Sequence, residues 1–162
     1  MNFSTCDFCD AHKSDESGAF RVLPGVFRSY GGIERFFGPV TTVKCFEDNS
    51  LVKAAVESEG QGRVLVVDGA ASLRRALLGG KLADAATKNG WSGLLINGCV
   101  RDLAELKAAQ VGILALSHVP MPTDRRGQGL ANVCVHVQGV DIRPGDWLYA
   151  DADGVIVSAA QL

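Results

Sequence analysis

The sequence lacks several features that would each indicate a particular class of protein. No apolar run approaches the roughly 18 residues that a membrane-spanning helix needs. The first residues, MNFSTCDFCDAHKSDESG, contain no apolar signal region. An excess of basic residues is missing as well, because the net charge is −2, whereas a nucleic-acid-binding surface is normally basic. We therefore expect a soluble, cytoplasmic protein that binds neither a membrane nor nucleic acid directly.

Familiar catalytic signatures are missing too. The chain has no Ser-His-Asp pattern, no G-x-S-x-G elbow, no P-loop and no G-x-G-x-x-G fingerprint. Its five cysteines are an odd number in a chain without an export signal, which favours reduced thiols. Cys6 and Cys9 form a C-x2-C pair without a second pair at zinc-site spacing, so we expect them to pack the N-terminal helix. Cys45, Cys99 and Cys134 lie in apolar runs and are expected to be buried.

The composition is that of an ordinary globular protein. Hydrophobic residues make up 47% of the chain and charged residues 21%, which excludes extensive disorder. A length of 162 residues is enough for one domain with a substantial core. We expect a single domain over residues 1–162.

Two apolar runs with a helix between them organise the middle of the chain. The first run, residues 64–67, is β-branched and stops at Asp68-Gly69. A helix is predicted over residues 80–89, because apolar positions recur at helical spacing and Asn89-Gly90 ends it. A second run follows at residues 94–96 and stops at Asn97-Gly98. This order is typical of a βαβ unit with parallel strands, so we predict a mixed α/β fold.

The βαβ geometry predicts a ligand site. Both strands end at the same edge of the sheet, which is where such sheets usually bind ligands. The helix begins at this edge with free N–H groups that suit an anion, and Gly79-Gly80 allows close approach. Arg101 adds a bidentate cation, and Asp102 adds a hard oxygen ligand of the kind that Mg²⁺ or Mn²⁺ prefers. These groups together suggest a site for a small carboxylate.

A purely structural interpretation of the same residues stays open. Asp102 could stabilise the first turn of a helix over residues 103–109, where the helix dipole favours an acidic residue. Arg101 could be a surface residue, and the paired glycines could serve only to turn the chain.

The remaining elements follow from local patterns. Helices are predicted over residues 4–13, capped by Ser4, and 51–59; strands over 20–23, 40–46, 111–116 and 133–140; and a hairpin joining 147–150 to 155–157. Residues 71–78, with Arg74 and Arg75, could begin a helix that continues into the next one, and the two arginines could reach a neighbouring subunit. Asp151 and Asp153 are expected to stabilise the hairpin turn, and His118 is expected to be structural.

The spacing of Gly80, twenty residues, Arg101-Asp102, two residues and Glu105 resembles the G-x20-R-D-x2-E/D motif of class II pyruvate aldolases of the RraA-like group. That group includes 4-hydroxy-4-methyl-2-oxoglutarate aldolases and regulators of ribonuclease E activity. TVKCFEDNSLVKAAVE, GRVLVVDGAASLRRALLGGKLA, GLLINGCVRD and GDWLYADADGVIVS also look like family segments in the expected order. The resemblance covers nearly the whole chain. It implies a β/β/α swivelling-domain fold, usually assembled as a trimeric ring with sites between subunits.

The resemblance implies a divalent-metal-dependent aldolase. Its expected reaction is cleavage of 4-hydroxy-4-methyl-2-oxoglutarate, and of the related 4-carboxy-4-hydroxy-2-oxoadipate, to pyruvate. The same pyruvate enolate arises when oxaloacetate loses CO₂, so a secondary oxaloacetate decarboxylase activity is expected. A Schiff-base aldolase would need a desolvated lysine, for which Lys81 and Lys44 are candidates by position only.

The need to stabilise a pyruvate enolate suggests a role for each site residue. We expect Asp102 to hold Mg²⁺ or Mn²⁺, with waters completing the shell, and Arg101 to bind the oxo oxygen or carboxylate and stabilise the enolate. Glu105 is expected to orient Arg101 or to bind a metal-bound water. Asp68 could make a contact to the groups that surround the metal ligands. Backbone N–H groups of Gly79, Gly80, Lys81 and Leu82 are expected to hold a substrate carboxylate.

The alternative function is a protein-binding regulator that docks on ribonuclease E. The complete Arg101-Asp102-x2-Glu105 motif favours retained aldolase chemistry. The segment EDNSLVKAAVE and the chain length resemble the regulators more than the longer aldolases. We also expect the carboxyl terminus, which ends at Leu162, to lack acidic groups that some aldolases contribute to a neighbour's metal shell.

Overall fold

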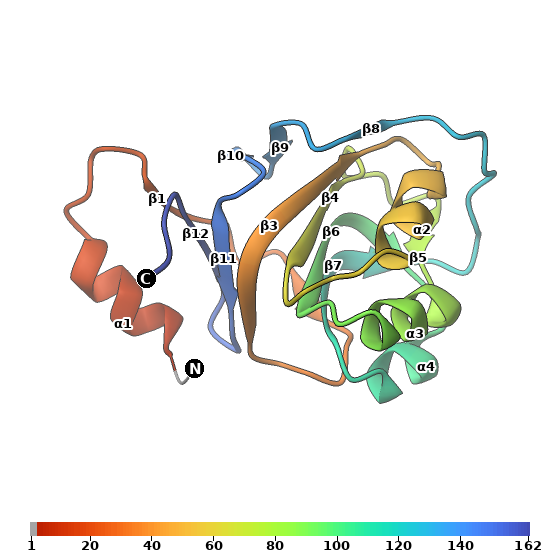
Figure 1. Ribbon diagram of the computed structural model, residues 1–162, viewed down its shortest axis with the longest axis horizontal. Helices are drawn as coiled ribbons and strands as arrows, with labels where there is room; N and C mark the ends of the chain where they lie inside the picture. The colour runs from red at the N-terminus through yellow and green to blue at the C-terminus, as the bar shows by residue number, and fades with distance from the viewer. Residues whose placement is uncertain (1–2) are drawn as a thin grey trace.

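The computed structural model describes residues 3–162 and has a β/β/α arrangement (Figure 1). The helices are α1 (Thr5–His12), α2 (Ser50–Val56), α3 (Gly80–Lys88) and α4 (Leu103–Ala108). The strands are β1 (Phe20–Val22), β2 (Arg28–Ser29), β3 (Phe36–Lys44), β4 (Val64–Asp68), β5 (Ala76–Leu78), β6 (Gly93–Val100), β7 (Gly112–His118), β8 (Leu130–Ala131), β9 (Val135–Val137), β10 (Val140–Ile142), β11 (Trp147–Ala150) and β12 (Val155–Ser158). None of the described helices is long and apolar enough to cross a membrane.

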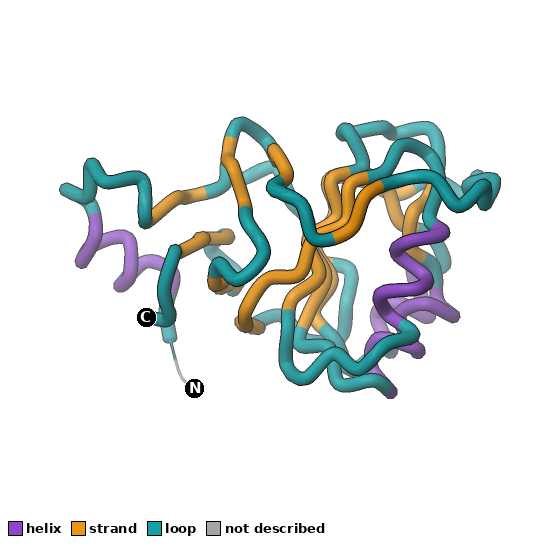
Figure 2. Tube along the Cα trace, turned by 45° about the horizontal axis from the view of Figure 1, so that its top comes forward, coloured by secondary structure: helices purple, strands orange, loops and turns teal. Residues whose placement is uncertain are grey.

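The long strand β3 joins two parts of one sheet, whose strand order is β1-β12-β11-β3-β4-β6-β7-β2. From β3 to β7 neighbouring strands are parallel, whereas β11 and β12 are antiparallel to their neighbours. Helices α2, α3 and α4 cover one face of the parallel part, and the β9–β10 and β11–β12 hairpins lie on the other side of the molecule (Figures 1 and 2).

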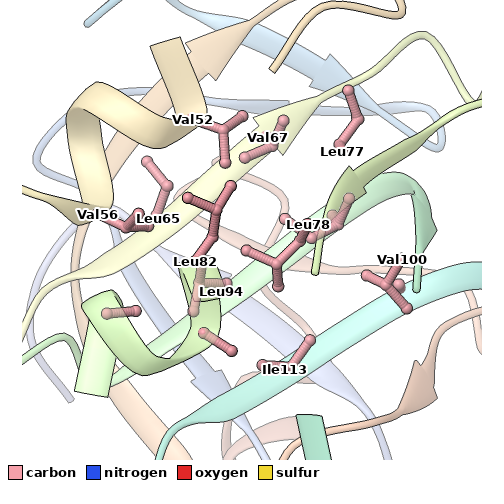
Figure 3. Close-up of a cluster of buried hydrophobic side chains, with 14 of the residues drawn as sticks. Val52, Val56, Leu65, Val67, Leu77, Leu78, Leu82, Leu94, Val100 and Ile113 are labelled. Carbon is pink, nitrogen blue, oxygen red and sulfur yellow. The ribbon is translucent and has the colours of Figure 1, made fainter. Parts of the chain in front are cut away.

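The core between the helices and the parallel strands explains why the middle of the chain is so apolar. All five residues of β4 and all eight of β6 are buried, as expected for parallel strands covered on both faces. Leu82, Ala83 and Ala86 of α3 pack onto this surface, together with Val52 and Val56 of α2 (Figure 3). The apolar face predicted for residues 80–89 is therefore the face that docks α3 on the sheet.

Phe36 organises the second core, which lies between the sheet and the β9–β10 and β11–β12 hairpins. Its ring lies directly on Gly93 and Gly112, where an added Cβ would come within 2.1 Å and 2.0 Å of ring carbons. These are the first residues of β6 and β7. Their glycines make room for an aromatic ring from β3, so the start of each strand is specified by packing against a distant residue.

The predicted βαβ unit is confirmed, since β4 and β6 pair in parallel with α3 between them. Two details of that prediction are wrong. The second strand continues through Gly98 to Val100 because its far end pairs with β5. Residues 71–78 form a loop and then β5 in place of a helix, since Ala76 and Leu78 pair with β6.

The prediction of one strand over residues 133–140 is also wrong. The chain turns at Gln138 and Gly139, whose φ angles are 49° and 84°, and β9 pairs back onto β10. Positive φ at both central residues is the geometry of a tight two-residue hairpin. Cys134, which precedes β9, is exposed and not buried as predicted, whereas Cys45 and Cys99 are buried.

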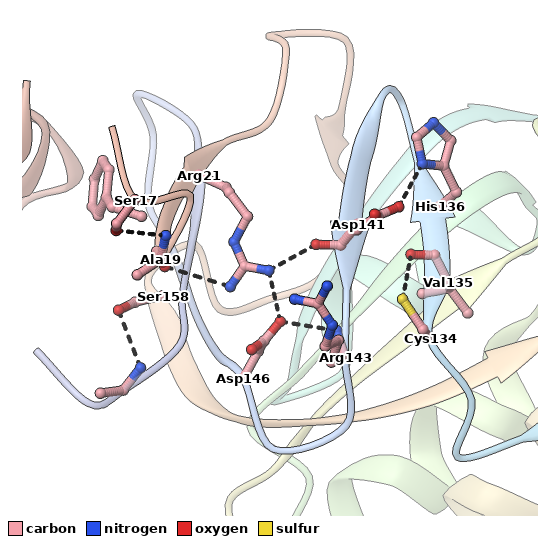
Figure 4. A network of polar contacts seen from close by, with 12 residues as sticks. Ser17, Ala19, Arg21, Cys134, Val135, His136, Asp141, Arg143, Asp146 and Ser158 are labelled. Carbon is pink, nitrogen blue, oxygen red and sulfur yellow. Dashed lines mark hydrogen bonds and ion pairs between the residues drawn. The ribbon is translucent and has the colours of Figure 1, made fainter. Parts of the chain in front are cut away.

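Arg21 connects the edge strand β1 to β10 and to the turn that follows β10 (Figure 4). Its Nη1 donates to the Asp141 carbonyl at 2.8 Å and to Asp146 Oδ2 at 3.0 Å. Asp146 Oδ2 also accepts the Arg143 N–H at 2.9 Å. Because Arg21 and Asp146 are both largely buried, this pair fixes the β-rich end of the molecule.

Candidate active site

A cavity of about 360 Å³ opens at the carboxyl edge of the parallel strands, beside the start of α3. Six of the predicted site residues line it: Gly79, Lys81, Leu82, Arg101, Asp102 and Glu105. The structure thus brings together residues from the β5–α3 connection and from the β6–α4 connection. A volume near the lower end of the usual range for ligand pockets suits a small molecule.

Asp102 is held in an uncommon backbone conformation at the centre of this site. Its φ of 62° and ψ of 49° lie in the left-handed region, which Asp tolerates better than most residues because its short side chain can bond locally. This conformation turns the carboxylate back to α3, where Oδ2 accepts the Gly80 N–H at 3.0 Å. Arg101 Nε lies 3.8 Å from the same oxygen. The Asp102 side chain therefore caps the start of α3, a different helix. It makes no capping bond to α4, the helix that Asp102 precedes.

Gly79 and Gly80 are needed because other side chains lie where their Cβ atoms would be. A Cβ on Gly79 would lie 2.6 Å from Asp102 Oδ2 and 3.3 Å from Arg101 Nε. A Cβ on Gly80 would overlap Glu105, at 1.6 Å from Oε2. Both carboxylates therefore rest against the glycine backbone at the positive end of α3, a position that stabilises negative charge.

Fewer backbone N–H groups at the start of α3 are free to bind a substrate carboxylate than the sequence predicted. Of the N–H groups in the first turn of α3, that of Gly80 donates to Asp102 and that of Leu82 donates to the Gly79 carbonyl at 3.1 Å. The N–H of Lys81 has no acceptor within its own helix, since the second position of a helix never does. Lys81 is the backbone donor in this turn that remains for a substrate carboxylate.

Five further residues line the cavity and were not predicted: Asn49, Ala76, Pro122, Thr123 and Arg125. Asn49 comes from the start of α2, and Thr123 and Arg125 come from the long connection between β7 and β8. Thr123 Oγ1 and Arg125 Nε donate to Asn49 Oδ1 at 2.8 Å and 3.0 Å. No sequence pattern predicts that Asn49 meets Thr123 and Arg125. They are more than seventy positions apart, and the connection between β7 and β8 has no periodic pattern.

Other residues considered from sequence lie outside the cavity. Asp68 is buried and bonds the Ala70 N–H and the Asn97 amide, so it organises the loop after β4. His118 is exposed, with its ring against Tyr30. Lys44 is exposed on β3, and Lys81, although it lines the cavity, is exposed as well; neither has the desolvation that a Schiff-base lysine needs.

The oxygen ligands of the site fit a lightly coordinated hard cation. Among residues 3–162, no group of three His, Cys, Asp or Glu side chains is close enough to enclose a metal ion. Mg²⁺ typically keeps several waters and uses one or two carboxylates plus substrate oxygens. Asp102 has Oδ1 left over after Oδ2 is bonded, and Glu105 lies beside it against Gly80. This donor set suits Mg²⁺ or Mn²⁺ and not a closed zinc site.

Comparison with known proteins places the chain among proteins of the same architecture. A family model described as RraA-like, Aldolase/RraA, matches residues 5–157. The chain belongs to the RraA-like family. A family member from Albidiferax ferrireducens, provisionally named a 4-hydroxy-4-methyl-2-oxoglutarate aldolase, is 60% identical over 99% of this chain and 98% of its own. One from Burkholderia mallei with the same provisional name is 57% identical over 98% of this chain and 96% of its own.

Solved structures confirm the RraA-like fold. The RNA-processing inhibitor RraA from Thermus thermophilus superposes with a TM-score of 0.94 at 42% identity, covering 100% of this chain and 96% of that one. A Geobacillus kaustophilus protein described as an S-adenosylmethionine:2-dimethylmenaquinone methyltransferase gives 0.93 at 42% identity, covering 99% and 97%. The mixed α/β fold class is therefore confirmed. These RraA-like relatives have three different functional names, so the function has to be inferred from the chemistry of the site.

Proposed function

We propose that this protein is a divalent-metal-dependent aldolase that cleaves 4-hydroxy-4-methyl-2-oxoglutarate to pyruvate. It also accepts 4-carboxy-4-hydroxy-2-oxoadipate and decarboxylates oxaloacetate slowly. The observation that carries the proposal is the convergence of Arg101, Asp102 and Glu105 on the Gly79-Gly80 start of α3 in one small cavity. The provisional names of relatives at 57–60% identity support the same chemistry.

The reaction requires stabilisation of an enolate. The C4 hydroxyl loses its proton, the C3–C4 bond breaks, and its electron pair moves onto the C2 oxo oxygen. Protonation at C3 then turns the enolate into pyruvate, and the C4 fragment leaves as a second pyruvate. The main task of the site is to stabilise the negative oxygen at C2.

The chain's own groups suit that task. Asp102 would hold Mg²⁺ or Mn²⁺, with waters completing its shell, and the bound ion would supply a Lewis-acid charge for the oxo oxygen. The half-exposed Arg101 guanidinium binds the oxo oxygen or the adjacent carboxylate through two parallel N–H donors. The free N–H of Lys81 holds the other side of that carboxylate. Glu105, on the wall of the cavity, orients Arg101 or passes the proton to and from water.

The proposal includes assembly as a homotrimer, with the cavity at a subunit boundary. The described chain supplies few acidic ligands, and several large apolar side chains are exposed, including Phe46, Leu73 and Met121. A neighbouring subunit would cover such groups and close the open side of the cavity. Light scattering on the purified protein tests this directly.

Asp102→Asn tests the assignment. We expect loss of metal-dependent pyruvate formation by at least about 100-fold, together with at least about 10-fold weaker Mn²⁺ binding measured by electron paramagnetic resonance. Asp84→Asn, which changes an exposed carboxylate on α3 outside the cavity, is the matched control and should behave as wild type. Unchanged turnover in Asp102→Asn, or wild-type turnover in the presence of a strong chelator, contradicts the proposal.

A second candidate function is regulation of ribonuclease E by direct docking. It is favoured by the 42% identity to a protein described as an RNA-processing inhibitor, with nearly complete coverage of both chains. The test adds the protein to ribonuclease E and measures the rate of RNA cleavage. Inhibition that survives Asp102→Ala supports docking independent of the site, and an unchanged cleavage rate at high protein concentration contradicts it.

A further inference from the structure

A second arginine, Arg125, lines the cavity. Arg125 lies in the connection between β7 and β8, and it lines the same space as Arg101. Its Nε donates to Asn49 Oδ1 at 3.0 Å. Within the part of the chain that the structure describes, its Nη1 and Nη2 have no protein acceptor. The two terminal nitrogens therefore form an open fork of the kind that binds carboxylates bidentately.

Asn49 holds this guanidinium in place. It is 8% exposed, and its Nδ2 donates to the carbonyl of Leu77 at 3.1 Å, on β5 two residues before Gly79. Its Oδ1 accepts from both Thr123 and Arg125. One buried amide thus links β5, the strand that leads into the substrate-binding turn, to the loop that carries Arg125.

The residues on either side of Asn49 fix the rest of that loop. Asp48 Oδ2 accepts the backbone N–H groups of Arg126 at 2.8 Å and Gln128 at 3.0 Å. Ser50 Oγ accepts the N–H of Gly127 at 3.0 Å. A loop anchored through its own backbone keeps Arg125 in position before a ligand arrives, which reduces the entropy lost on binding.

The charges around the cavity suit a ligand with two negative groups. Three cationic side chains line it, those of Lys81, Arg101 and Arg125, against the two carboxylates of Asp102 and Glu105. A divalent cation on those carboxylates would leave the cavity strongly positive. One guanidinium is enough for the 2-oxo acid end of a substrate, so the second is available for another anionic group.

We propose that Arg125, positioned by Asn49, is the specificity-determining residue that binds the second carboxylate of a 2-oxo dicarboxylate. This inference rests on the proposed aldolase function and extends it to the far end of the substrate. Arg101 takes the end that becomes the enolate, and Arg125 takes the carboxylate on the fragment that leaves. In this arrangement Arg125 would contact neither the cation nor the bond that breaks.

The two reactions of the site should depend on Arg125 differently. In the aldol cleavage the second carboxylate is charged throughout, so binding it lowers KM with little effect on kcat. In oxaloacetate the second carboxylate is the group that leaves as neutral CO₂. A cation on that group stabilises the substrate more than the transition state, so Arg125 should not accelerate decarboxylation.

The experiment compares Arg125→Ala with Arg126→Ala in the metal-loaded enzyme. Arg126 is the neighbouring exposed arginine, whose side chain contacts Asp124 and lies outside this cavity. For Arg125→Ala we expect KM for 4-hydroxy-4-methyl-2-oxoglutarate to rise about 10- to 100-fold, the effect of a lost charge-assisted bond, at nearly constant kcat. Exchange of the pyruvate methyl protons with deuterium, followed by NMR, should be unchanged because pyruvate has no second carboxylate. Arg126→Ala should match wild type in both assays.

Asn49→Ala tests the positioning role. KM should rise several-fold, and KM of the double variant with Arg125→Ala should rise no further than in Arg125→Ala alone. A KM for Arg125→Ala within twofold of the Arg126→Ala value overturns the inference. So does an equal loss of pyruvate exchange, which would place Arg125 at the reacting end.

A binding measurement separates this inference from the proposed reaction. Calorimetry with 2-oxoglutarate, which lacks the 4-hydroxyl group and cannot be cleaved, should show tighter binding than pyruvate in wild type and equal binding in Arg125→Ala. If wild type cleaves no substrate but keeps this difference, the aldolase assignment fails while the dicarboxylate site stands. If wild type binds the two acids equally, the dicarboxylate site fails whether or not turnover is seen.

Discussion

Among single residues, Gly80 has the largest influence on where the Asp102 and Glu105 carboxylates lie. Its N–H bonds Asp102, and its missing side chain leaves the space that Glu105 occupies. Its φ is not the reason for glycine here, because the residue is the first of an ordinary α-helix. The requirement is close approach, so a substitution should affect the site more than the fold.

Gly80→Ala should separate function from stability. The new Cβ would lie 1.6 Å from Glu105 Oε2 and 2.7 Å from Glu105 Cβ. The carboxylate can rotate into solvent, whereas the Cβ requires a small shift of α4 away from α3. Alanine is the better helix former and offsets part of that cost, so we expect the melting temperature to change by only a few degrees. Pyruvate formation should fall about 10- to 100-fold, as when the support of a metal site is displaced. Gly25→Ala, where the added Cβ meets no other atom within 4 Å, is the control. A melting temperature that collapses together with activity would contradict this account.

Among the structural elements, helix α2 and the loop over residues 123–128 are held together by the side chains of Asp48, Asn49 and Ser50. Asp48 is 2% exposed. Burial alone raises the pKa of its carboxyl, but hydrogen bonds from Ser50 and from the backbone of Gln128 and Arg126 outweigh this and hold the pKa at about 2. The folded state therefore favours the ionised form, which anchors the loop that carries Arg125.

Asp48→Asn should weaken the fold in a pH-dependent way. Because the folded pKa lies below the ordinary value of 3.8, the contribution of the carboxylate is complete above about pH 4 and is lost as the pH falls toward 2. At pH 7 the variant should be less stable by about 1.5–3 kcal/mol, the range for hydrogen bonds to a charged group. Urea unfolding at pH 7, 5 and 3 should show the difference from wild type shrinking at the lowest pH. Asp124→Asn, an exposed carboxylate on the same loop, should show no such trend.

Sequence patterns predicted the elements whose folding is decided locally. The βαβ unit and the β11–β12 hairpin are correct, because continuous apolar runs and polar turns mark them without reference to the rest of the chain. Residues 71–78 were misread because alanine, leucine and arginine favour helices, while pairing with β6 overrides that preference. The left-handed Asp102 and the turn at Gln138 depend on tertiary contacts that no local pattern records.

The candidate site was predictable only in part for the same reason. Gly79, Gly80, Arg101 and Asp102 follow from the rule that parallel strands end at one edge. Asn49 and Arg125 could not be found that way, since a buried amide joins them across seventy-six residues of chain. Their meeting depends on the complete sheet, with β3 beside β4 and β7 beside β6.

The whole molecule has two ends with different roles. Helices α2, α3 and α4 and the cavity lie at one end, while α1 packs against the β11–β12 hairpin at the other, near both chain termini (Figures 1 and 2). Phe3 and Phe8 contact Tyr149 there. Asp151 bonds the start of α1, since Oδ2 accepts the Thr5 N–H at 2.8 Å and Oδ1 accepts its hydroxyl at 2.6 Å. Asp151 therefore stabilises its own turn, as predicted, through Asp153, and it also attaches the first helix.

Asp151→Ala should release α1 and leave the site intact. Removing a buried acceptor leaves the donors of Thr5 without partners, which costs about 1–3 kcal/mol. Hydrogen exchange of the α1 amides should accelerate about tenfold or more, because local opening needs less free energy. KM and kcat for pyruvate formation should remain at wild-type values, since the cavity lies across the sheet. Asp84→Ala, which removes an exposed carboxylate on α3, is the control and should leave α1 protected. Equal exchange in the two variants would mean that the aromatic contacts of Phe3 and Phe8 hold α1 without Asp151.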